Sequence, residues 1–216
     1  MRISTDALLF DMDGTLISSM DSVLRCWNAW AQEYGIPEET WAGVQLHGRT
    51  AREIIADLLP EHQVDQAVAR IAELEIADVS AEGITVLPGT LDLLTSLPDE
   101  CWAVVTSASH RLAEARLHAV GIRTPLCIGA EDVQHGKPDP EPFLVAAEKL
   151  GVDPARCTVF EDAPVGLASG RAAGMTTVAL TTTHRADELL DADATVLDLS
   201  EVRAEEAGQG VELTVG

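Results

Sequence analysis

The sequence predicts an α/β fold in which helices cover both faces of a parallel sheet. Short apolar runs without polar alternation indicate strands that are buried on both faces. Segments of helical composition lie between these runs, which is the pattern of layered α/β proteins. The alternation stops over residues 18–83, where only helices are expected. We therefore expect a sheet core formed by residues 1–17 and 84–216, and an inserted α-helical cap formed by residues 18–83.

The first strand is expected at Ala7–Phe10, an apolar run that stops abruptly at Asp11. The other expected core strands are Trp102–Val105, Leu126–Ile128, Thr158–Phe160, Thr176–Leu180 and Ala194–Leu197. Near the end of the chain, the polar stretch Arg203–Gln209 is expected to be mobile. The alternating residues Val211–Val215 are expected to form a late edge strand.

The helices expected between these strands are Thr90–Ser96, His110–Val120, Glu141–Leu150 and Pro164–Ala173. Gly121 and Gly151 follow two of them as C-terminal caps. In the last helix, glycines recur every fourth residue at Gly166, Gly170 and Gly174. This spacing predicts one helix face that approaches the sheet closely.

Three helices are expected in the insert, at Asp21–Tyr34, Thr50–Leu59 and Val64–Ala77. Trp27 and Trp30 have helical spacing and are expected in the interior of the insert, rather than as a platform for a sugar ring. Glu73 and Glu75 are expected on a solvated helix face. The chain segments at residues 17–19 and 87–89 join the insert to the core, so they are the hinge candidates if the insert opens and closes.

The composition excludes several classes of function. The chain has 216 residues, with 36 acidic and 14 basic side chains and a net charge of −22. This charge disfavours nucleic acids and anionic membranes as partners. Four scattered cysteines are expected to be reduced core residues. The N-terminal apolar run is too short for a signal peptide, so we expect a cytoplasmic protein, and we expect a monomer.

Polar side chains gather where the predicted strands end. Asp11 and Asp13 follow the first strand, Thr106 follows the second, and Glu161 and Asp162 follow a later one. Ligands of open α/β sheets bind outside the carboxyl ends of the strands. These residues are therefore expected to form one site.

Each of these residues also has a simpler explanation when it is taken alone. Asp13 and Gly14 could form a turn, Thr106 could cap the next helix, and Glu161 could cap or pair with a cation. Lys137 could be a solvated loop charge. These explanations do not account for the placement of all of them at the same edge of the sheet.

Phosphoryl transfer is the chemistry that uses this whole set. A carboxylate such as Asp11 can attack phosphorus, but two anions repel and the step needs cations. Asp11 and Asp162 could hold Mg²⁺, which prefers oxygen ligands. The Thr106 hydroxyl, the Ser107 amide and the Lys137 ammonium could bind the phosphate.

Asp13 completes the set as a proton carrier. It lies two residues from Asp11 and could protonate the leaving alcohol and then activate the hydrolytic water. Two carboxylates in different surroundings can divide such roles.

Four segments in order resemble the motifs of the haloacid dehalogenase (HAD) superfamily. They are Asp11–Leu16, Val105–Ser107, Gly136–Pro140 and Phe160–Pro164. The resemblance covers nearly the whole chain, including the helical insert after the first motif. It implies a Rossmann-like, HAD-like parallel sheet core with a helical cap.

The resemblance also implies the roles of the motif residues. Asp11 would be the nucleophile and Asp13 the general acid and base, while Thr106 and Lys137 would bind phosphate. Mg²⁺ would be held by Asp11, by the main-chain carbonyl of Asp13 and by Asp162, with Glu161 as a further ligand or just behind them.

A finer resemblance points to the sugar- and polyol-phosphate phosphatase branch, which includes glycerol-phosphate and 2-deoxyglucose-6-phosphate phosphatases. It is carried by the segments Leu46–Thr50, Val133–Pro138 and Glu161–Gly166. The first of them places His47, Gly48 and Arg49 before a cap helix, where they could contact a small phosphorylated sugar or polyol.

The leading hypothesis is a Mg²⁺-dependent phosphatase of small sugar or polyol phosphates that works through an aspartyl phosphate. A sugar phosphomutase similar to β-phosphoglucomutase is the main alternative, because it uses the same motifs. A dehalogenase is less favoured, since it needs neither Mg²⁺ nor a residue like Asp13. A phosphate-responsive module without catalysis, and a purely structural acidic protein, explain the motif set less well.

Overall fold

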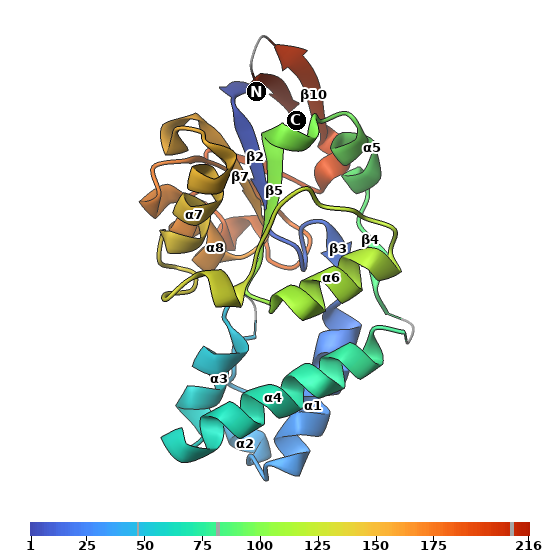
Figure 1. The fold of residues 1–216 in the computed structure, drawn as a ribbon, viewed down its shortest axis with the longest axis vertical. Coiled ribbons are helices and arrows are strands. Elements are labelled where there is room, and N and C mark those ends of the chain that lie inside the picture. The colour runs from blue at the N-terminus through green and yellow to red at the C-terminus, as the bar shows by residue number, and fades with distance from the viewer. Residues whose placement is uncertain (47, 81–82, 208–209) are drawn as a thin grey trace.

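A six-stranded parallel sheet forms the centre of the protein in the computed structural model (Figure 1). The model describes residues 1–46, 48–80, 83–207 and 210–216. The strand order is β6 (Cys127–Ile128), β5 (Trp102–Val105), β2 (Ala7–Phe10), β7 (Cys157–Glu161), β8 (Thr176–Leu180) and β9 (Ala194–Val196). The predicted α/β class is confirmed, and each predicted core strand is present to within a residue or two.

Strand β2 lies in the interior of the sheet. Leu8 is in register with Trp102 of β5 on one side and with Thr158 of β7 on the other. All four residues of β2 are fully buried, which explains why the sequence shows a continuous apolar run here. Because β2 and β7 are parallel and in register, Asp11 and Asp162 leave the sheet at the same edge.

Helices cover both faces of this sheet. Helices α5 (Thr90–Thr95) and α6 (His110–Ala119) pack on one face, and α7 (Glu141–Leu150) and α8 (Pro164–Ala172) on the other (Figure 1). Short 3-10 helices lie at Asp99–Cys101, Ala130–Asp132, Pro154–Arg156, Ala186–Glu188 and Leu199–Glu201. All four predicted core helices are confirmed.

The glycines in and after α8 only partly follow the prediction that they bring the helix close to the sheet. A Cβ atom on Gly170 would lie 3.1 Å from Val159 in β7, so this position does bring the helix close to the sheet. Gly174 has open space around it and instead adopts a φ of +75° just after the helix. It therefore ends the helix rather than packing on the sheet.

The helical segment, defined here as residues 20–78, lies below the sheet core (Figure 1). It contains α1 (Met20–Glu33), α2 (Glu38–Trp41), α3 (Ala51–Leu58) and α4 (Glu61–Asp78). Three of these helices were predicted, and the one-turn α2 was not.

The helical segment has its own apolar interior, as predicted for its tryptophans. Trp27 and Trp30 are buried there, and the Trp30 indole donates a hydrogen bond to the Ala67 carbonyl at 3.0 Å. Residue Thr50 caps α3 reciprocally with Glu53, which explains where that helix begins.

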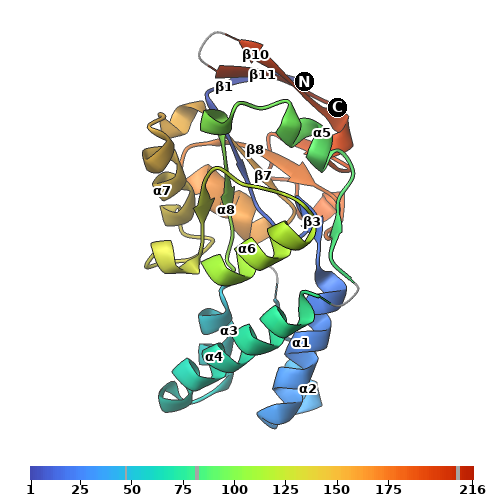
Figure 2. The same ribbon diagram turned by 45° about the vertical axis from the view of Figure 1, so that its right-hand side comes forward.

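Two adjacent chain segments join the helical segment to the core. Strands β3 (Ile17–Ser18) and β4 (Thr85–Val86) form a small antiparallel ribbon (Figure 2). The prediction of an insert without strands is therefore wrong at its edges, where Ser18 pairs with Thr85. Of the two predicted hinge segments, residues 17–19 begin within this ribbon, and residues 87–89 follow it directly.

The end of the chain corrects two predictions. Of the stretch expected to be mobile, residues 203–207 belong to β10 (Val202–Ala207), whereas residues 208–209 lie outside the described residues. The expected edge strand belongs to β11 (Gly210–Val215), which is the middle strand of a three-stranded antiparallel sheet. Its other neighbour is β1 (Arg2–Thr5), which was not predicted. The polar residues of β10 are mostly exposed, so their composition indicates a loop although the backbone is paired on one side.

The state of the cysteines agrees with the sequence analysis. All four cysteines are unpaired thiols, and three of them are buried. Within the described residues, every helix is too short or too polar to cross a membrane.

Candidate active site

The first part of the site is the carboxylate of Asp11, directly after β2. Its backbone N–H donates to the Phe160 carbonyl at 3.0 Å, which extends the sheet ladder by one residue. The side chain is buried, and its Oδ1 accepts a hydrogen bond from the Lys137 ammonium at 2.6 Å. Burial raises the pKa of Asp11 well above its ordinary value, an effect that Lys137 only partly offsets.

Lys137 is almost completely buried, which corrects the simple interpretation of a solvated loop charge. Its ammonium donates to Asp11, to Glu161 at 2.6 Å and to the Val105 carbonyl at 3.0 Å. Burial lowers the pKa of Lys137, but the two carboxylates outweigh burial and raise it. The lysine therefore remains a cation inside the site.

Glu161 and Asp162 come from the end of β7. Glu161 accepts from Lys137 with one oxygen, and with the other it accepts from the backbone N–H groups of Asp162 and Ala163 at 3.0 Å. Asp162 accepts hydrogen bonds from the hydroxyls of Thr183 and Thr15. Burial, followed by the charge of Glu161, raises the pKa of Asp162 to about 7.

Asp11, Glu161 and Asp162 bring carboxylate oxygens within 4.8 Å of one another. Carboxylate oxygens are the ligands preferred by Mg²⁺ and Ca²⁺, and three buried acids facing one ammonium leave negative charge that a cation would neutralise. The residues at this place thus fit a divalent metal, as predicted.

Gly14 lets the chain turn beside these acids. Its φ is +93°, a conformation that side chains rarely adopt, and a Cβ atom here would collide with the Asp162 carboxylate. The close approach of the first and last motifs therefore requires glycine at this position.

Thr106 and Ser107, after β5, line the same cavity as Asp11. The Thr106 hydroxyl accepts a hydrogen bond from the Ala108 N–H at 3.1 Å, while the cap of α6 is Ser109. The Ser107 hydroxyl donates to the Gly48 carbonyl at 2.8 Å, so it joins the core to the helical segment.

Asp13 follows Asp11 by two residues, but its carboxylate binds other partners than the cluster of Asp11, Glu161 and Asp162. Its Oδ1 accepts from Ser19 at 2.5 Å, and its Oδ2 accepts from the Arg116 guanidinium at 2.9 Å. The same guanidinium donates to Glu75 of α4 at 3.1 Å. Arg116 of α6 thus links the Asp13 carboxylate to Glu75 of α4.

Two of these residues were missed by the sequence analysis, and one prediction about them is wrong. Glu75 was expected on a solvated helix face but is buried, whereas Glu73 is exposed as predicted. A signal was present: the buried residues of α4 are Val64, Ala67, Ile71 and Glu75, so the glutamate continues an apolar stripe. Arg116 likewise lies on the buried face of α6 with Leu112 and Leu117.

Three residues of the helical segment were predicted to contact the substrate, and the structure treats each of them differently. His47 lies outside the described residues. Gly48 and Arg49 line the cavity, but the Arg49 guanidinium donates to Asp57 at 2.6 Å and to the Glu53 carbonyl at 3.2 Å. In this state Arg49 is directed along α3.

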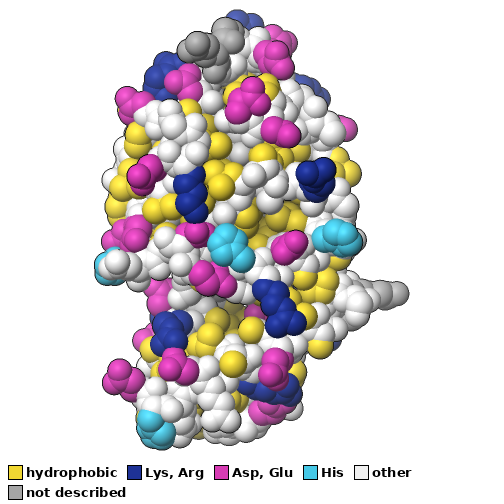
Figure 3. Space-filling model, viewed as in Figure 1, with side chains coloured by type: hydrophobic (Ala, Val, Ile, Leu, Met, Phe, Trp, Pro, Cys, Tyr) yellow, Lys and Arg dark blue, Asp and Glu magenta, His cyan; other side chains and the backbone are white. Residues whose placement is uncertain are grey.

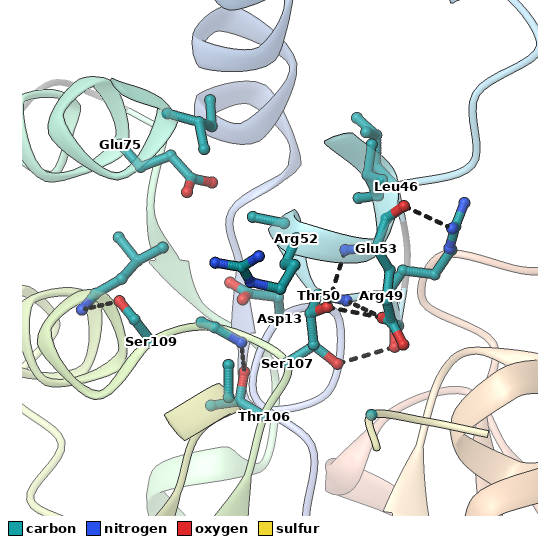
Figure 4. A pocket seen from close by; sticks show the side chains of 18 of the residues that line it. Asp13, Leu46, Arg49, Thr50, Arg52, Glu53, Glu75, Thr106, Ser107 and Ser109 are labelled. Carbon is teal, nitrogen blue, oxygen red and sulfur yellow. Dashed lines mark hydrogen bonds between the residues drawn. The ribbon is translucent and has the colours of Figure 1, made fainter. Parts of the chain in front are cut away.

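The cavity between core and helical segment has a volume of about 530 Å³. Asp11 is among the residues that line its core side. Asp13 and Thr106 also lie on that side, and Leu46, Arg49 and Glu75 lie on its helical side (Figure 4). Charged side chains of both signs gather around the hollow between the two parts on the face shown in Figure 3. Pockets of this size accept small-molecule ligands.

A comparison with protein families decides what kind of protein this is. The family model for haloacid dehalogenase-like hydrolases matches residues 5–174, which include the Asp11, Lys137 and Asp162 positions. The chain belongs to the HAD-like hydrolases. The predicted family is thereby confirmed.

Two relatives of this HAD-like hydrolase are named as a hexitol phosphatase and a glycerol-1-phosphate phosphohydrolase. Hexitol phosphatase A of Escherichia coli (strain K12) is 37% identical over 199 residues, covering 90% of this chain and 91% of the relative. Glycerol-1-phosphate phosphohydrolase 2 of Saccharomyces cerevisiae is 34% identical over 200 residues, covering 88% and 80%.

Solved structures of HAD-like proteins share the fold. A hydrolase from Pseudomonas syringae superposes with a TM-score of 0.81 and 25% identity, covering 90% of this chain and 94% of the other. Because the coverage is nearly complete, the likeness includes the helical segment as well as the sheet core.

Proposed function

We propose that this HAD-like hydrolase is a Mg²⁺-dependent phosphatase of small sugar or polyol phosphates, with Asp11 as the nucleophile. The observation that carries the proposal is the buried Asp11 carboxylate, which lies 2.6 Å from the Lys137 ammonium and clusters with Glu161 and Asp162. The names of the hexitol and glycerol phosphate relatives support the substrate class.

Asp11, Asp162 and the main-chain carbonyl of Asp13 would hold the metal, with Glu161 close behind. When bound, Mg²⁺ supplies the positive charge that lets a carboxylate approach a phosphate. Glu161 already accepts from Lys137 and from two backbone N–H groups, which favours a supporting role for it.

Three groups on the core side are suited to bind the phosphate. Lys137 supplies a fixed charge next to Asp11, and the Thr106 hydroxyl and Ser107 N–H follow β5 at the same edge. Lys137 is held by Asp11 and Glu161, so it needs no reorganisation to meet an anion that arrives at Asp11.

The reaction has two steps. An Asp11 oxygen forms a bond to phosphorus while the bond from phosphorus to the alcohol oxygen breaks, and Asp13 gives its proton to that oxygen. Water then attacks the phosphorus of the aspartyl phosphate, Asp13 takes the proton of the water, and phosphate leaves as the Asp11 carboxylate is restored. Asp13 must exchange its present partners, Ser19 and Arg116, for the substrate during these steps.

The helical segment serves in this proposal as the cap, with the predicted bounds of residues 18–83. It covers the cavity opposite Asp11, and its closure would exclude bulk water and select the alcohol part of the substrate by size. The ribbon of β3 and β4 is the place where the cap would turn.

A screen of phosphorylated metabolites, in parallel with Mg²⁺ and with EDTA, tests the function. We expect phosphate release from sugar or polyol phosphates with Mg²⁺ and loss of that release with EDTA. Asp11→Asn should lower kcat by about 10³-fold or more, because the nucleophile is lost. Activity near the parent level in this variant would end the proposal.

Product analysis distinguishes the phosphatase from the mutase. Incubation with a hexose 1-phosphate should yield free sugar and phosphate. Isomerised sugar phosphate without free phosphate would favour the phosphomutase instead.

A further inference from the structure

Three charged side chains, linked by hydrogen bonds, connect the helical segment to the core at the wall of the cavity. The Glu75 carboxylate on α4 accepts from Arg116 on α6 at 3.1 Å, and Arg116 donates to Asp13 at 2.9 Å. The side chains of Glu75 and Arg116 are only 9% and 3% exposed. Figure 4 shows Glu75 on the wall that faces the loop carrying Asp13.

The buried ion pair between Glu75 and Arg116 is not explained by stability alone. Burying an ion pair gives up the hydration of both charges, and an apolar pair of similar shape is often as stable. The neighbours of Glu75 at the apolar positions of α4, such as Ile71 and Ala67, show that the helix packs well without charge. A glutamate in this stripe therefore calls for a function at the cavity.

Two arginines on the helical wall have partners toward the outside. Arg49 pairs with Asp57 and Arg52 with Asp65, and both of these aspartates are exposed. By contrast, the Arg116 Nε is a buried donor that has no hydrogen-bond acceptor among the described residues. Arg116 lines the cavity, so a shift of its guanidinium toward a bound ligand would give this buried N–H an acceptor.

The position of Glu75 and Arg116 indicates which part of a substrate they would contact. In the proposed reaction Asp13 protonates the ester oxygen, and Arg116 is one hydrogen bond away from Asp13. The substrate carbon next to the phosphoester carbon would lie in this zone. A hydroxyl on that carbon can accept from a guanidinium and donate to a carboxylate, which is what Arg116 and Glu75 offer.

We propose that Glu75 and Arg116 form a subsite for the hydroxyl group next to the phosphoester, so that the enzyme prefers phosphate esters of polyols to those of simple alcohols. This inference rests on the proposed phosphatase function. It assigns substrate recognition to an ionic pair formed between the helical segment and the core.

Two esters that differ only in this hydroxyl test the subsite: glycerol 1-phosphate and 3-hydroxypropyl phosphate. We expect kcat/KM of the parent protein to be about 10-fold or more higher for glycerol 1-phosphate, since sites built to bind a hydroxyl reject analogues that lack it. Glu75→Gln removes an acceptor, and Arg116→Lys keeps the cation beside Asp13 but removes Nε.

Each variant should lose most of the preference by lowering kcat/KM for glycerol 1-phosphate about 10-fold, while 3-hydroxypropyl phosphate changes less than about 3-fold. Glu73→Gln, on the exposed face of the same helix, is the matched control and should leave both values unchanged. Melting temperatures measured in parallel check that the variants are folded.

The outcomes separate this inference from the proposed function. Equal kcat/KM for the two esters in the parent, hydrolysis of other esters but of neither of these, or equal losses on both esters in the variants would overturn the subsite. The last result would mean that the pair only fastens α4 to α6 or positions Asp13. No phosphate release from any ester in the screen would overturn the phosphatase function itself.

Discussion

The two parts of the molecule that meet at the cavity have very different interiors. At the carboxyl edge of the sheet, three buried acids cluster, and two of them, Asp11 and Glu161, bind the buried ammonium of Lys137. In the helical segment, the interior is built from aliphatic side chains and from Trp27 and Trp30, whose rings meet edge to face, with Trp30 fully buried.

This difference shows where function and stability are located. The edge of the sheet concentrates like charges that repel in the absence of a metal, and it is held together mainly by Lys137. The helical segment gains its stability from apolar burial, which does not depend on ionisation. The stability of the two parts should therefore respond differently to charge, pH and metal.

Removal of the central cation tests this contrast most strongly. Lys137→Met leaves Asp11 and Glu161 buried without their common partner, so the free energy of unfolding should fall by about 3–5 kcal/mol in EDTA. Urea titration measures this loss in the free energy of unfolding.

The matched control is Lys149→Met, which removes a half-exposed lysine paired with Asp132. It should change the free energy of unfolding by less than about 1 kcal/mol. Similar losses in the two lysine variants would show that the edge of the sheet does not depend on its buried ammonium.

The pH dependence of stability is the next largest effect. In the metal-free protein, the pKa of Asp162 is raised from 3.8 to about 7, so the folded state holds this proton more tightly than the unfolded state. The stabilisation is complete below pH 3.8 and is lost as the pH rises through 7. Between pH 5 and 8 in EDTA, we expect the free energy of unfolding to fall by roughly 2–4 kcal/mol.

Urea titrations across this range, repeated with Asp162→Asn, check the assignment. The variant should have a flatter profile because its side chain does not ionise. Saturating Mg²⁺ should also flatten the profile of the parent, since a bound cation stabilises the ionised acids. An unchanged slope in the variant would mean that other groups cause the dependence.

The smallest effect is expected in the helical segment. Trp30→Phe removes the indole that donates to the Ala67 carbonyl and reduces the buried apolar surface, so it should lower the free energy of unfolding by about 1–3 kcal/mol. The loss should be the same at pH 5 and pH 8 and with or without Mg²⁺. A loss that varies with pH or Mg²⁺ would break the contrast between the two interiors.

Much of the site at the sheet edge could be predicted because it follows from connectivity. Residues that come directly after parallel strands must leave the sheet at the same edge, so Asp11, Thr106 and Asp162 were placed together from local patterns alone. Lys137 was predicted by its motif, but its contact with Glu161 was not, because a loop residue can reach many positions.

The contact between the helical segment and the core was less predictable. Glu75 and Arg116 are 41 residues apart in the chain, and each was treated by its charge alone as a surface residue or left aside. Their positions on apolar helix stripes were the available signal. Likewise, the exposed composition of β10 hid a strand whose pairing depends on β11.

The sequence by itself determined the sheet, its flanking helices and the acids at its carboxyl edge, because local patterns define strands and strand ends define an edge. Only the tertiary structure decided that Glu75 would be buried against Arg116, and that β10 would pair with β11 beside β1. Such contacts depend on how separate elements are oriented, and that orientation is set by packing across the whole molecule rather than by any one segment.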